Sequence, residues 1–244
     1  MRWLFALILI ASCNQKTYQE TPQVTSSVPT NEVTVGFVGR CQPDMAYVND
    51  LYCPRLIRTC KQWIDPPTAL ARRCNEFGPA TCQAKEEPLT FCIDKEEMAM
   101  DYFPIVDVSW KQAERICAAN DKRLCQEEEW TLACEGPGHL GYPYGNVRDS
   151  TACNIDQEDL VENNIFLDKR ESIIEYPRCV SYYGVHNMTG NVDEWVVGKN
   201  QEPYRSLLAG GWWGPLRNNC RDQTGGHDEY YHQPSIGFRC CKDR

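Results

Sequence analysis

None of the fifteen cysteines in this 244-residue chain stands in a C-x-x-C pair. Zinc frameworks rely on such closely spaced pairs, so the spacing argues against a structural zinc site. The chain also lacks a basic patch, since its formal net charge is −9 and its pI is near 5. A nucleic-acid-binding protein concentrates lysine and arginine on one face, which excludes nucleic acid as a partner. There is no internal repeat, so repeat architectures are excluded as well.

The cysteines that are present suit an exported protein. Setting Cys13 aside leaves fourteen, an even number that allows up to seven disulfides. Disulfides persist in oxidising compartments, so this count predicts a domain that folds outside the cytoplasm. Spacing alone does not fix which cysteines pair.

Residues 1–12 have the form of an export signal, with one arginine, a short apolar run and then small residues. The run is too short to span a bilayer as a helix. Residues 10–13 also resemble a bacterial lipobox, which predicts cleavage before Cys13 and lipid modification of its thiol; the alternative is an ordinary signal peptide with a chance cysteine. Residues 13–40 are mostly polar and predict a flexible tether. We therefore expect an exported lipoprotein, anchored to a membrane of the bacterial cell envelope or in the periplasm.

The remaining chain predicts one ordered domain of about 200 residues. Residues 41–91 form its cysteine-rich N-terminal part, where Pro and Gly predict irregular structure with a strand at 46–48 and a short helix at 69–75. Residues 92–244 form the main part. Within it, the candidate buried positions of the mixed segment 163–175 are Ile165, Phe166, Ile173 and Ile174.

Two helices are predicted in the main part. The first runs over residues 109–120, where Ser109 and Gln112 form a capping box. Its apolar face consists of Trp110, Ala113, Ile116 and Cys117. The second runs over residues 126–134 and opens with three glutamates, which suit the helix dipole and are expected to be solvated.

Three short blocks near the C-terminal end carry the most information: Gly184–Trp195, Gly210–Trp213 and Gly237–Cys240. Gly, Asn and Asp crowd them and suit backbone conformations that other residues avoid. Five further blocks precede them in order, and these are Phe91–Glu96, Pro104–Trp110, Lys122–Leu124, Glu129–Trp130 and Tyr142–Asn146.

In this order the blocks resemble those of the formylglycine-generating enzyme family, also called the sulfatase-modifying-factor domain, over about residues 92–241. The resemblance implies an α+β fold, a variant of the C-type-lectin-like fold with much irregular structure, two helices and small antiparallel sheets. The cysteine count adds that the fold is disulfide-rich. A fold does not fix a function, which depends on the residues of the site.

The family's oxidase binds copper(I) through two cysteines in the loop after a Gly-Gly block, and soft thiolates suit this ion. Counted forward from Gly211, Cys220 falls on the second cysteine, and Pro215, which cannot ligate a metal, falls on the first. Counted back from Gly237, Cys220 falls on a structural cysteine and both catalytic cysteines are missing. The second count is the better one, and under either count the pair is absent. Copper is therefore not expected, and Cys220 is only an exploratory catalytic candidate.

The resemblance also implies disulfides. In vertebrate members, the cysteine that ends the first helix pairs with the cysteine of the Gly-Phe-Arg-Cys block, and the cysteine that ends the second helix pairs with the structural one. Carried over, these pairs are Cys117–Cys240 and Cys134–Cys220. Cys125 stands where the family usually has proline, and Cys241 is a candidate partner for it.

Calcium is the cofactor that the resemblance supports, because hard oxygen ligands suit this ion. The oxygens that carry over are those of Asn191, Val192 (backbone) and Glu194 in one site, and Asn154, Ile155 (backbone) and Asp168 in the other. The alternative for both sites is a tight turn held by hydrogen bonds without metal.

The family's groove binds extended peptide, so the resemblance implies an extended peptide or a glycan as ligand. The residues expected to line the groove are Trp212, Trp213, Arg217, Arg221, His227, Tyr230 and Tyr231. His227 is also an exploratory catalytic candidate, although its spacing from His232 does not suit two ligands on one helical face.

Three functions follow as alternatives. The first is a non-catalytic peptide- or glycan-binding module at the cell envelope. The second is a formylglycine-generating or related metal-dependent oxidase with a rearranged site, which needs a free thiol or a histidine metal site. The third is a structural envelope protein held by disulfides and a tether. The sequence leaves open whether the protein is an enzyme.

Overall fold

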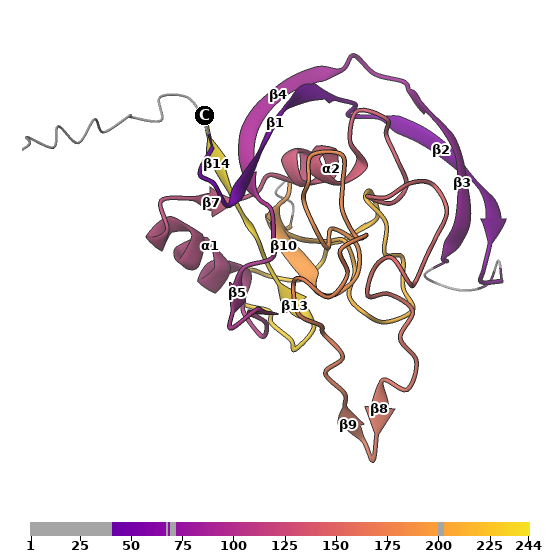
Figure 1. Cartoon of the computed structure of the whole chain (residues 1–244), viewed down its shortest axis with the longest axis vertical. Helices are drawn as coiled ribbons and strands as arrows, with labels where there is room; N and C mark the ends of the chain where they lie inside the picture. Colours follow the sequence, from indigo (N-terminus) through magenta and orange to yellow (C-terminus); the bar gives the residue numbers. More distant parts are fainter. Residues whose placement is uncertain (1–40, 67, 69–71, 200–202) are drawn as a thin grey trace, which may run out of the picture. The chain divides into compact units, whose positions relative to one another are not determined.

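A long antiparallel ribbon begins the fold in the computed structural model, which describes residues 41–66, 68, 72–199 and 203–244. The expected export signal, the lipidation site Cys13 and the tether lie outside these residues. The ribbon consists of β1 (Met45–Tyr52), β2 (Leu56–Trp63), β3 (Cys74–Cys82) and β4 (Glu87–Asp94). Strand β1 pairs with β4 and β2 pairs with β3, so the ribbon curls around α2 (Glu127–Glu135) as one continuous hairpin (Figure 1).

Two four-stranded sheets organise the rest. In the first, the order is β1-β4-β14-β7, with β14 at Cys240–Asp243 and β7 at Arg123–Leu124. In the second, the order is β12-β11-β10-β13, with bounds Gln223–Thr224, Ser206–Ala209, Asp193–Val197 and Ile236–Gly237. Two small hairpins complete the set, β5 (Ala99–Met100) with β6 (Phe103–Pro104), and β8 (Val161–Glu162) with β9 (Ile165–Phe166).

Both predicted helices form. Helix α1 (Trp110–Ala119) begins at the Ser109–Gln112 capping box. Helix α2 begins one residue later than expected. Its Glu129 is almost fully buried, because it bonds back to the backbone N–H of Gln126 (2.9 Å) and pairs with Arg123 (2.7 Å). The expectation that all three opening glutamates are solvated is therefore wrong for Glu129.

Two apolar cores hold these layers together. The first lies between the ribbon and α2, where Val48 and Ile93 pack with Trp130. The second lies between α1 and the second sheet, where Trp110 packs with Trp195. All five of these side chains are almost completely excluded from solvent. Among the described residues, no helix is both long and apolar enough to cross a membrane.

Seven disulfides join all fourteen cysteines of the described residues. Their partners are Cys41–Cys92, Cys53–Cys82, Cys60–Cys74, Cys117–Cys240, Cys125–Cys241, Cys134–Cys220 and Cys153–Cys179. The first three cross the ribbon. The fourth and sixth are the pairs that the resemblance implies, and the fifth joins Cys125 to the candidate partner Cys241.

Three local expectations are wrong. The cysteine-rich N-terminal part, expected to be mostly irregular, forms the regular ribbon of β1 to β4. Cys74 and Asn75 begin strand β3 rather than end a helix, and residues 69–71 lie outside the described part of the chain. Ile165, Phe166 and Ile174 are 65%, 39% and 64% exposed rather than buried. Ile165 lies on the β8–β9 hairpin, which projects away from the rest of the domain (Figure 1). Apolar composition alone did not distinguish this hairpin from a core segment.

Candidate functional site

The turn before β10 brings two chain segments into close contact. Gly190 and Asn191 have positive φ angles of 81° and 55°. A Cβ atom on Gly190 would lie 2.3 Å from the carbonyl oxygen of Asn154, so only glycine fits there. This approach lets the backbone N–H of Asn191 donate to the same carbonyl (2.9 Å). Asn154 and Asn191, expected in two separate calcium sites, therefore lie side by side.

The Asn191 side chain holds a buried acid. Its Nδ2 donates to both carboxyl oxygens of Glu97 (3.0 Å each), and Nδ2 of Asn187 donates to one of them (2.9 Å). Glu97 is 2% exposed. Burial, aided by the nearby carboxylate of Glu194, raises the pKa of Glu97 to about 8. The Glu97 carboxyl is therefore mostly neutral at pH 7.

Glu194 forms a buried ion pair. Its two oxygens accept bonds from Nη2 and Nε of Arg239 at 2.7 Å each, and Nε1 of Trp130 adds a third bond at 2.8 Å. The other guanidinium N–H groups of Arg239 donate to the carbonyls of Asp94, Lys95 and His186. Because every polar group of the pair has a partner, the arrangement is suited to stabilise the motif rather than to react.

The oxygens carried over from the family's calcium sites do not fit that ion as they stand. Both carboxylate oxygens of Glu194 face the Arg239 guanidinium. Oδ1 of Asn191 accepts N–H bonds from Asn154 (3.1 Å) and from the backbone of Glu171 (2.8 Å).

The second set is no better placed. Oδ1 of Asn154 accepts a bond from Gln157 (3.1 Å), and the half-exposed Asp168 pairs with Arg170 (2.9 Å). Val192 and Ile155, expected to contribute backbone oxygens, are both buried. In the described part of the chain, no group of three or more His, Cys, Asp or Glu side chains could hold a metal ion.

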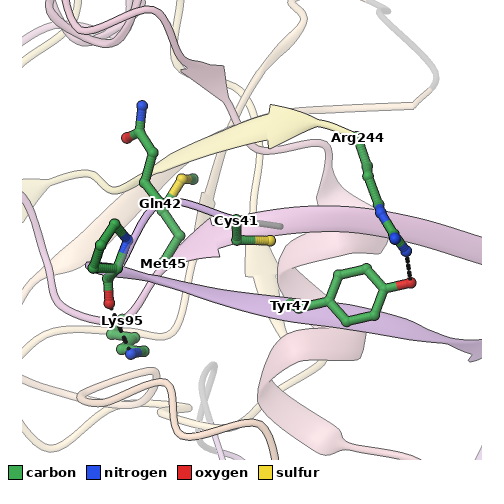
Figure 2. Close-up of a pocket in the computed structure, with 7 residues that line it drawn as sticks. Cys41, Gln42, Met45, Tyr47, Lys95 and Arg244 are labelled. Atoms are coloured by element: carbon green, nitrogen blue, oxygen red, sulfur yellow. Dashed lines mark hydrogen bonds between the residues drawn. The ribbon is translucent and has the colours of Figure 1, made fainter. Parts of the chain in front are cut away.

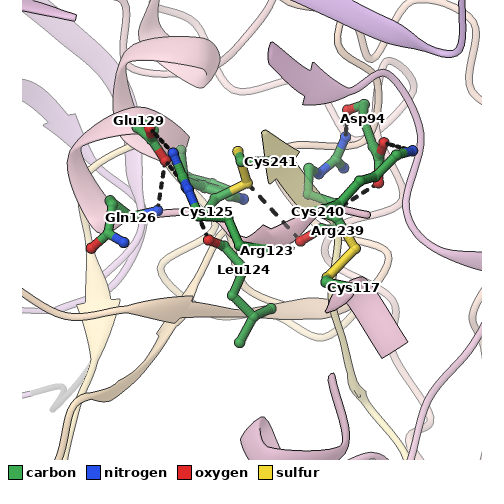
Figure 3. Close-up of a disulfide and its surroundings, with 12 residues drawn as sticks. Asp94, Cys117, Arg123, Leu124, Cys125, Gln126, Glu129, Arg239, Cys240 and Cys241 are labelled. Carbon is green, nitrogen blue, oxygen red and sulfur yellow. Dashed lines mark hydrogen bonds and ion pairs between the residues drawn. A yellow bond between two sulfur atoms is a disulfide. The ribbon is translucent and has the colours of Figure 1, made fainter. Parts of the chain in front are cut away.

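Two disulfides flank the buried arginine at the end of the fold. The Cys117–Cys240 bridge links α1 to β14. The Cys125–Cys241 bridge links the short connection between β7 and α2 to the same strand. Figure 3 shows both cysteine pairs beside Arg239, whose backbone carbonyl faces the Cys125 sulfur. The adjacent residues Cys240 and Cys241 therefore fix strand β14 from two sides.

Cys220 lies in a disulfide with Cys134 and is fully buried. A thiol in a disulfide is neither a nucleophile nor a copper ligand. Pro215 precedes it in the same loop and offers no thiolate. The residues present therefore do not fit the copper pair of the family's oxidase.

The tryptophans expected in a ligand groove differ in exposure. Trp212 is partly exposed, and its ring meets that of Trp213 edge-on at 5.3 Å between centroids. Phe166 packs against both rings, at 5.6 Å from Trp212 and 5.8 Å from Trp213. Trp213 is fully buried, so the expectation that it lines a groove is wrong.

The two arginines expected in the groove serve the interior instead. Arg217 pairs with the buried Asp193 at 3.1 Å, and burial raises the pKa of that carboxyl despite the pairing. Arg221 pairs with the fully buried Glu135 at 2.5 Å. Each guanidinium neutralises a carboxylate that has little water around it, which explains both positions without a ligand.

An open hollow of about 480 Å³ gathers the aromatic residues of the C-terminal segment. Its lining residues are Tyr204, Gly226, His227, Asp228, Tyr230, Tyr231 and His232. His227, Tyr230 and Tyr231 were expected to face a ligand, and the structure brings them together here. Tyr204, which precedes β11, and His232 were not expected to face a ligand.

A second hollow lies at the start of β1 and is shown in Figure 2. Its cationic groups are already occupied. Nζ of Lys95 donates to the carbonyl of Pro43 (3.0 Å), and the guanidinium of Arg244 bonds to the hydroxyl of Tyr47. With its charged groups paired inside the chain, this hollow offers less to a ligand than the aromatic one.

Comparisons with known proteins agree with this fold and this motif. Residues 40–244 match the model of the sulfatase-modifying factor enzyme 1-like domain, and the chain belongs to that family. It is 32% identical to the inactive C-alpha-formylglycine-generating enzyme 2 of Bos taurus over 57% of this chain and 50% of that protein. It is 26% identical to the formylglycine-generating enzyme of Thermomonospora curvata over the same shares, so the chain spans about half the length of both relatives. The crystal structure of CarF has the same fold, with a TM-score of 0.58 and 14% identity over 82% of this chain and 98% of that one.

Sequence reasoning missed Glu97. It stands in the charged run Asp94 to Glu97, and such a run ordinarily predicts a solvated turn. Only the contact with Asn187 and Asn191, about ninety residues away in the chain, buries it. No local signal could have identified this residue.

Proposed function

We propose that this chain is an exported, lipid-anchored protein whose sulfatase-modifying-factor domain binds a ligand, an extended peptide or a glycan, without catalysing an oxidation. The observation that carries the non-catalytic half is the Cys134–Cys220 disulfide, which occupies the one thiol near the family's copper site. The Bos taurus relative, described as inactive, is consistent with this reading.

An oxidase with a rearranged site has no specific support. It would need a free thiol or a histidine-based metal site. All fourteen cysteines of the described residues are in disulfides, and the same residues offer no cluster of metal-binding side chains. The disulfides also support export, since they require an oxidising compartment.

The test of the non-catalytic half uses the mature protein. Copper(I) is added under argon, bound copper is quantified, and a Cys-x-Pro-x-Arg peptide is then incubated with oxygen and analysed by mass spectrometry. We expect no stoichiometric copper and no formylglycine. A Cys134→Ala variant, which frees the Cys220 thiol, is the matched control. Conversion of the peptide by the unmodified protein would refute the proposal.

The binding and anchoring halves have separate tests. Peptide and glycan arrays probed with the mature protein should give at least one saturable ligand, and their uniform failure would favour a purely structural role. Lipid attachment is checked by metabolic labelling with a fatty acid, which should be lost in a Cys13→Ser variant. Retained labelling in that variant would contradict modification at this thiol.

A further inference from the structure

The aromatic hollow beside Tyr204 has the composition of a sugar-binding site. We propose that it binds a neutral saccharide, one ring of which stacks on the exposed aromatic side chains. This inference rests on the ligand-binding role proposed above and narrows its ligand class. The volume of about 480 Å³ lies within the range of roughly 300–1,000 Å³ typical of small-molecule sites.

The lining residues decide between ligand classes. They include three tyrosines and two histidines, but no aliphatic side chain. An acyl chain would therefore find no aliphatic surface to cover. A pyranose ring presents C–H groups on its faces and hydroxyls on its rim, and each hydroxyl both donates and accepts. Tyrosine hydroxyls and imidazole nitrogens have the same dual capacity, and their rings supply flat apolar faces.

Three of these groups are available to a ligand. The hydroxyls of Tyr204 and Tyr230 and the imidazole of His227 form no hydrogen bond with another described residue, whereas Tyr231 and His232 are engaged. The Tyr231 hydroxyl bonds to Gln233 (2.6 Å), and the His232 ring bonds to Asp107 (2.8 Å). Tyr230 is also 72% exposed, so its ring face is open to solvent.

The loop that carries the hollow is already ordered. The ring of His227 stacks on that of Tyr231, with centroids 4.0 Å apart and planes 11° from parallel. Oδ1 of Asp228 accepts the backbone N–H groups of Tyr230 and Tyr231 at 2.9 Å each. The hydroxyl of Ser206 donates to the carbonyl of His227 at 2.6 Å. Binding therefore pays little for loop ordering.

A cationic side chain is the rival ligand, because electron-rich rings also attract cations. Two acids lie nearby, and among the described residues only Glu229 has a cationic partner. Asp228 is held by the two backbone N–H groups, and Glu229 accepts the backbone N–H of Arg205 (3.2 Å) and lies 3.9 Å from its guanidinium. Asp228 keeps its negative charge, so a cation is a separate arm of the test, whereas the uncommitted hydroxyls and imidazole match a neutral polar ligand.

The test compares neutral sugars with a cation. Saturation-transfer NMR is run on the mature protein with chitohexaose, cellohexaose, xylohexaose and a neutral glycan array, and with tetra-arginine as the cationic probe. The variant Tyr230→Ala removes one open ring. Tyr182→Ala is the matched control, since Tyr182 is also 72% exposed but does not line the hollow.

We expect at least one neutral saccharide to bind, with about tenfold weaker affinity in Tyr230→Ala and unchanged affinity in Tyr182→Ala. Failure of every neutral saccharide, or binding that survives Tyr230→Ala unchanged, overturns the inference. Binding of tetra-arginine alone overturns the saccharide and leaves the broader binding role standing. Uniform failure of the peptide and glycan arrays described above would remove the broader binding role itself, so the two failures are distinguishable.

Discussion

Replacing Glu97 with glutamine isolates the energetic effect of the buried acid behind the motif turn. The folded protein holds this carboxyl at a pKa of about 8, against an ordinary value of 4.5, because burial and the neighbouring Glu194 carboxylate disfavour its charge. The folded state therefore binds a proton at Glu97 between these two pH values, and the unfolded state does not. Stability must fall as pH rises through this window and level off above it.

The size of this effect follows from the two pKa values. At ~1.4 kcal/mol per pH unit between them, ionising the folded Glu97 costs up to about 5 kcal/mol above pH 8. Glutamine carries no charge at any pH and avoids this cost. It also places an N–H group opposite Nδ2 of Asn191, which now donates to both oxygens of Glu97. That mismatch should cost about 1–3 kcal/mol at every pH, so it shifts the whole curve without changing its slope.

The assay is denaturant unfolding with all disulfides intact, at pH 5 to 9, for the unmodified protein, Glu97→Gln and the exposed control Glu162→Gln. The stability of Glu97→Gln relative to the unmodified protein should rise by several kcal/mol from pH 5 to pH 8 and then stay constant. The control should follow the unmodified protein throughout. A difference between Glu97→Gln and the unmodified protein that is flat over this range would show that Glu97 ionises normally, and would refute the reasoning.

Three further predictions concern stability, the first two measured by denaturant unfolding and the third by thermal unfolding. Arg239→Met leaves Glu194 buried without its counter-charge and should cost about 3–5 kcal/mol; a loss below about 1 kcal/mol would contradict a dry ion pair. Removing the Cys134–Cys220 bridge by a double alanine substitution should cost about 2–5 kcal/mol, and an unchanged midpoint would show that the pair is not bridged in solution. Calcium and a chelator should give the same melting temperature; a calcium-dependent rise would mean that Glu194 leaves Arg239 to ligate the ion.

Local patterns explain why much of the fold could be predicted. The capping box at Ser109 and the spacing of apolar residues act within a few residues, so α1 is readable from sequence alone. The ribbon is different, because its strands pair residues up to about fifty positions apart and β2 has a largely exposed surface. No residue of β2 is fully buried, so its sequence carries little apolar pattern from which to predict a strand. The prediction that Ile165 is buried was wrong for the opposite reason, since its hairpin is apolar but exposed.

In the candidate site, too, local features could be predicted from the sequence and long-range contacts could not. The crowding of glycine and asparagine around Gly190 indicated a special turn, and the turn exists. The residues that contact the turn could not be predicted from the sequence, because Glu97 and Arg239 come from distant segments of the chain. Trp213 and Arg217 carry side chains common in binding grooves, yet one is buried and the other neutralises Asp193. Residue type indicated binding, and only packing could assign them to the interior.

The seven bridges separate into two closed sets. Three connect cysteines only within residues 41–92, and four connect cysteines only within residues 117–241. A protease cut anywhere in residues 93–116 would thus yield two fragments with no covalent link, joined by packing and by the β4–β14 pairing. Within each set the six and eight cysteines allow on the order of 15 and 105 connectivities, and the structure has one of each. Residues 41–92 therefore contain every cysteine that the three bridges of the N-terminal ribbon need.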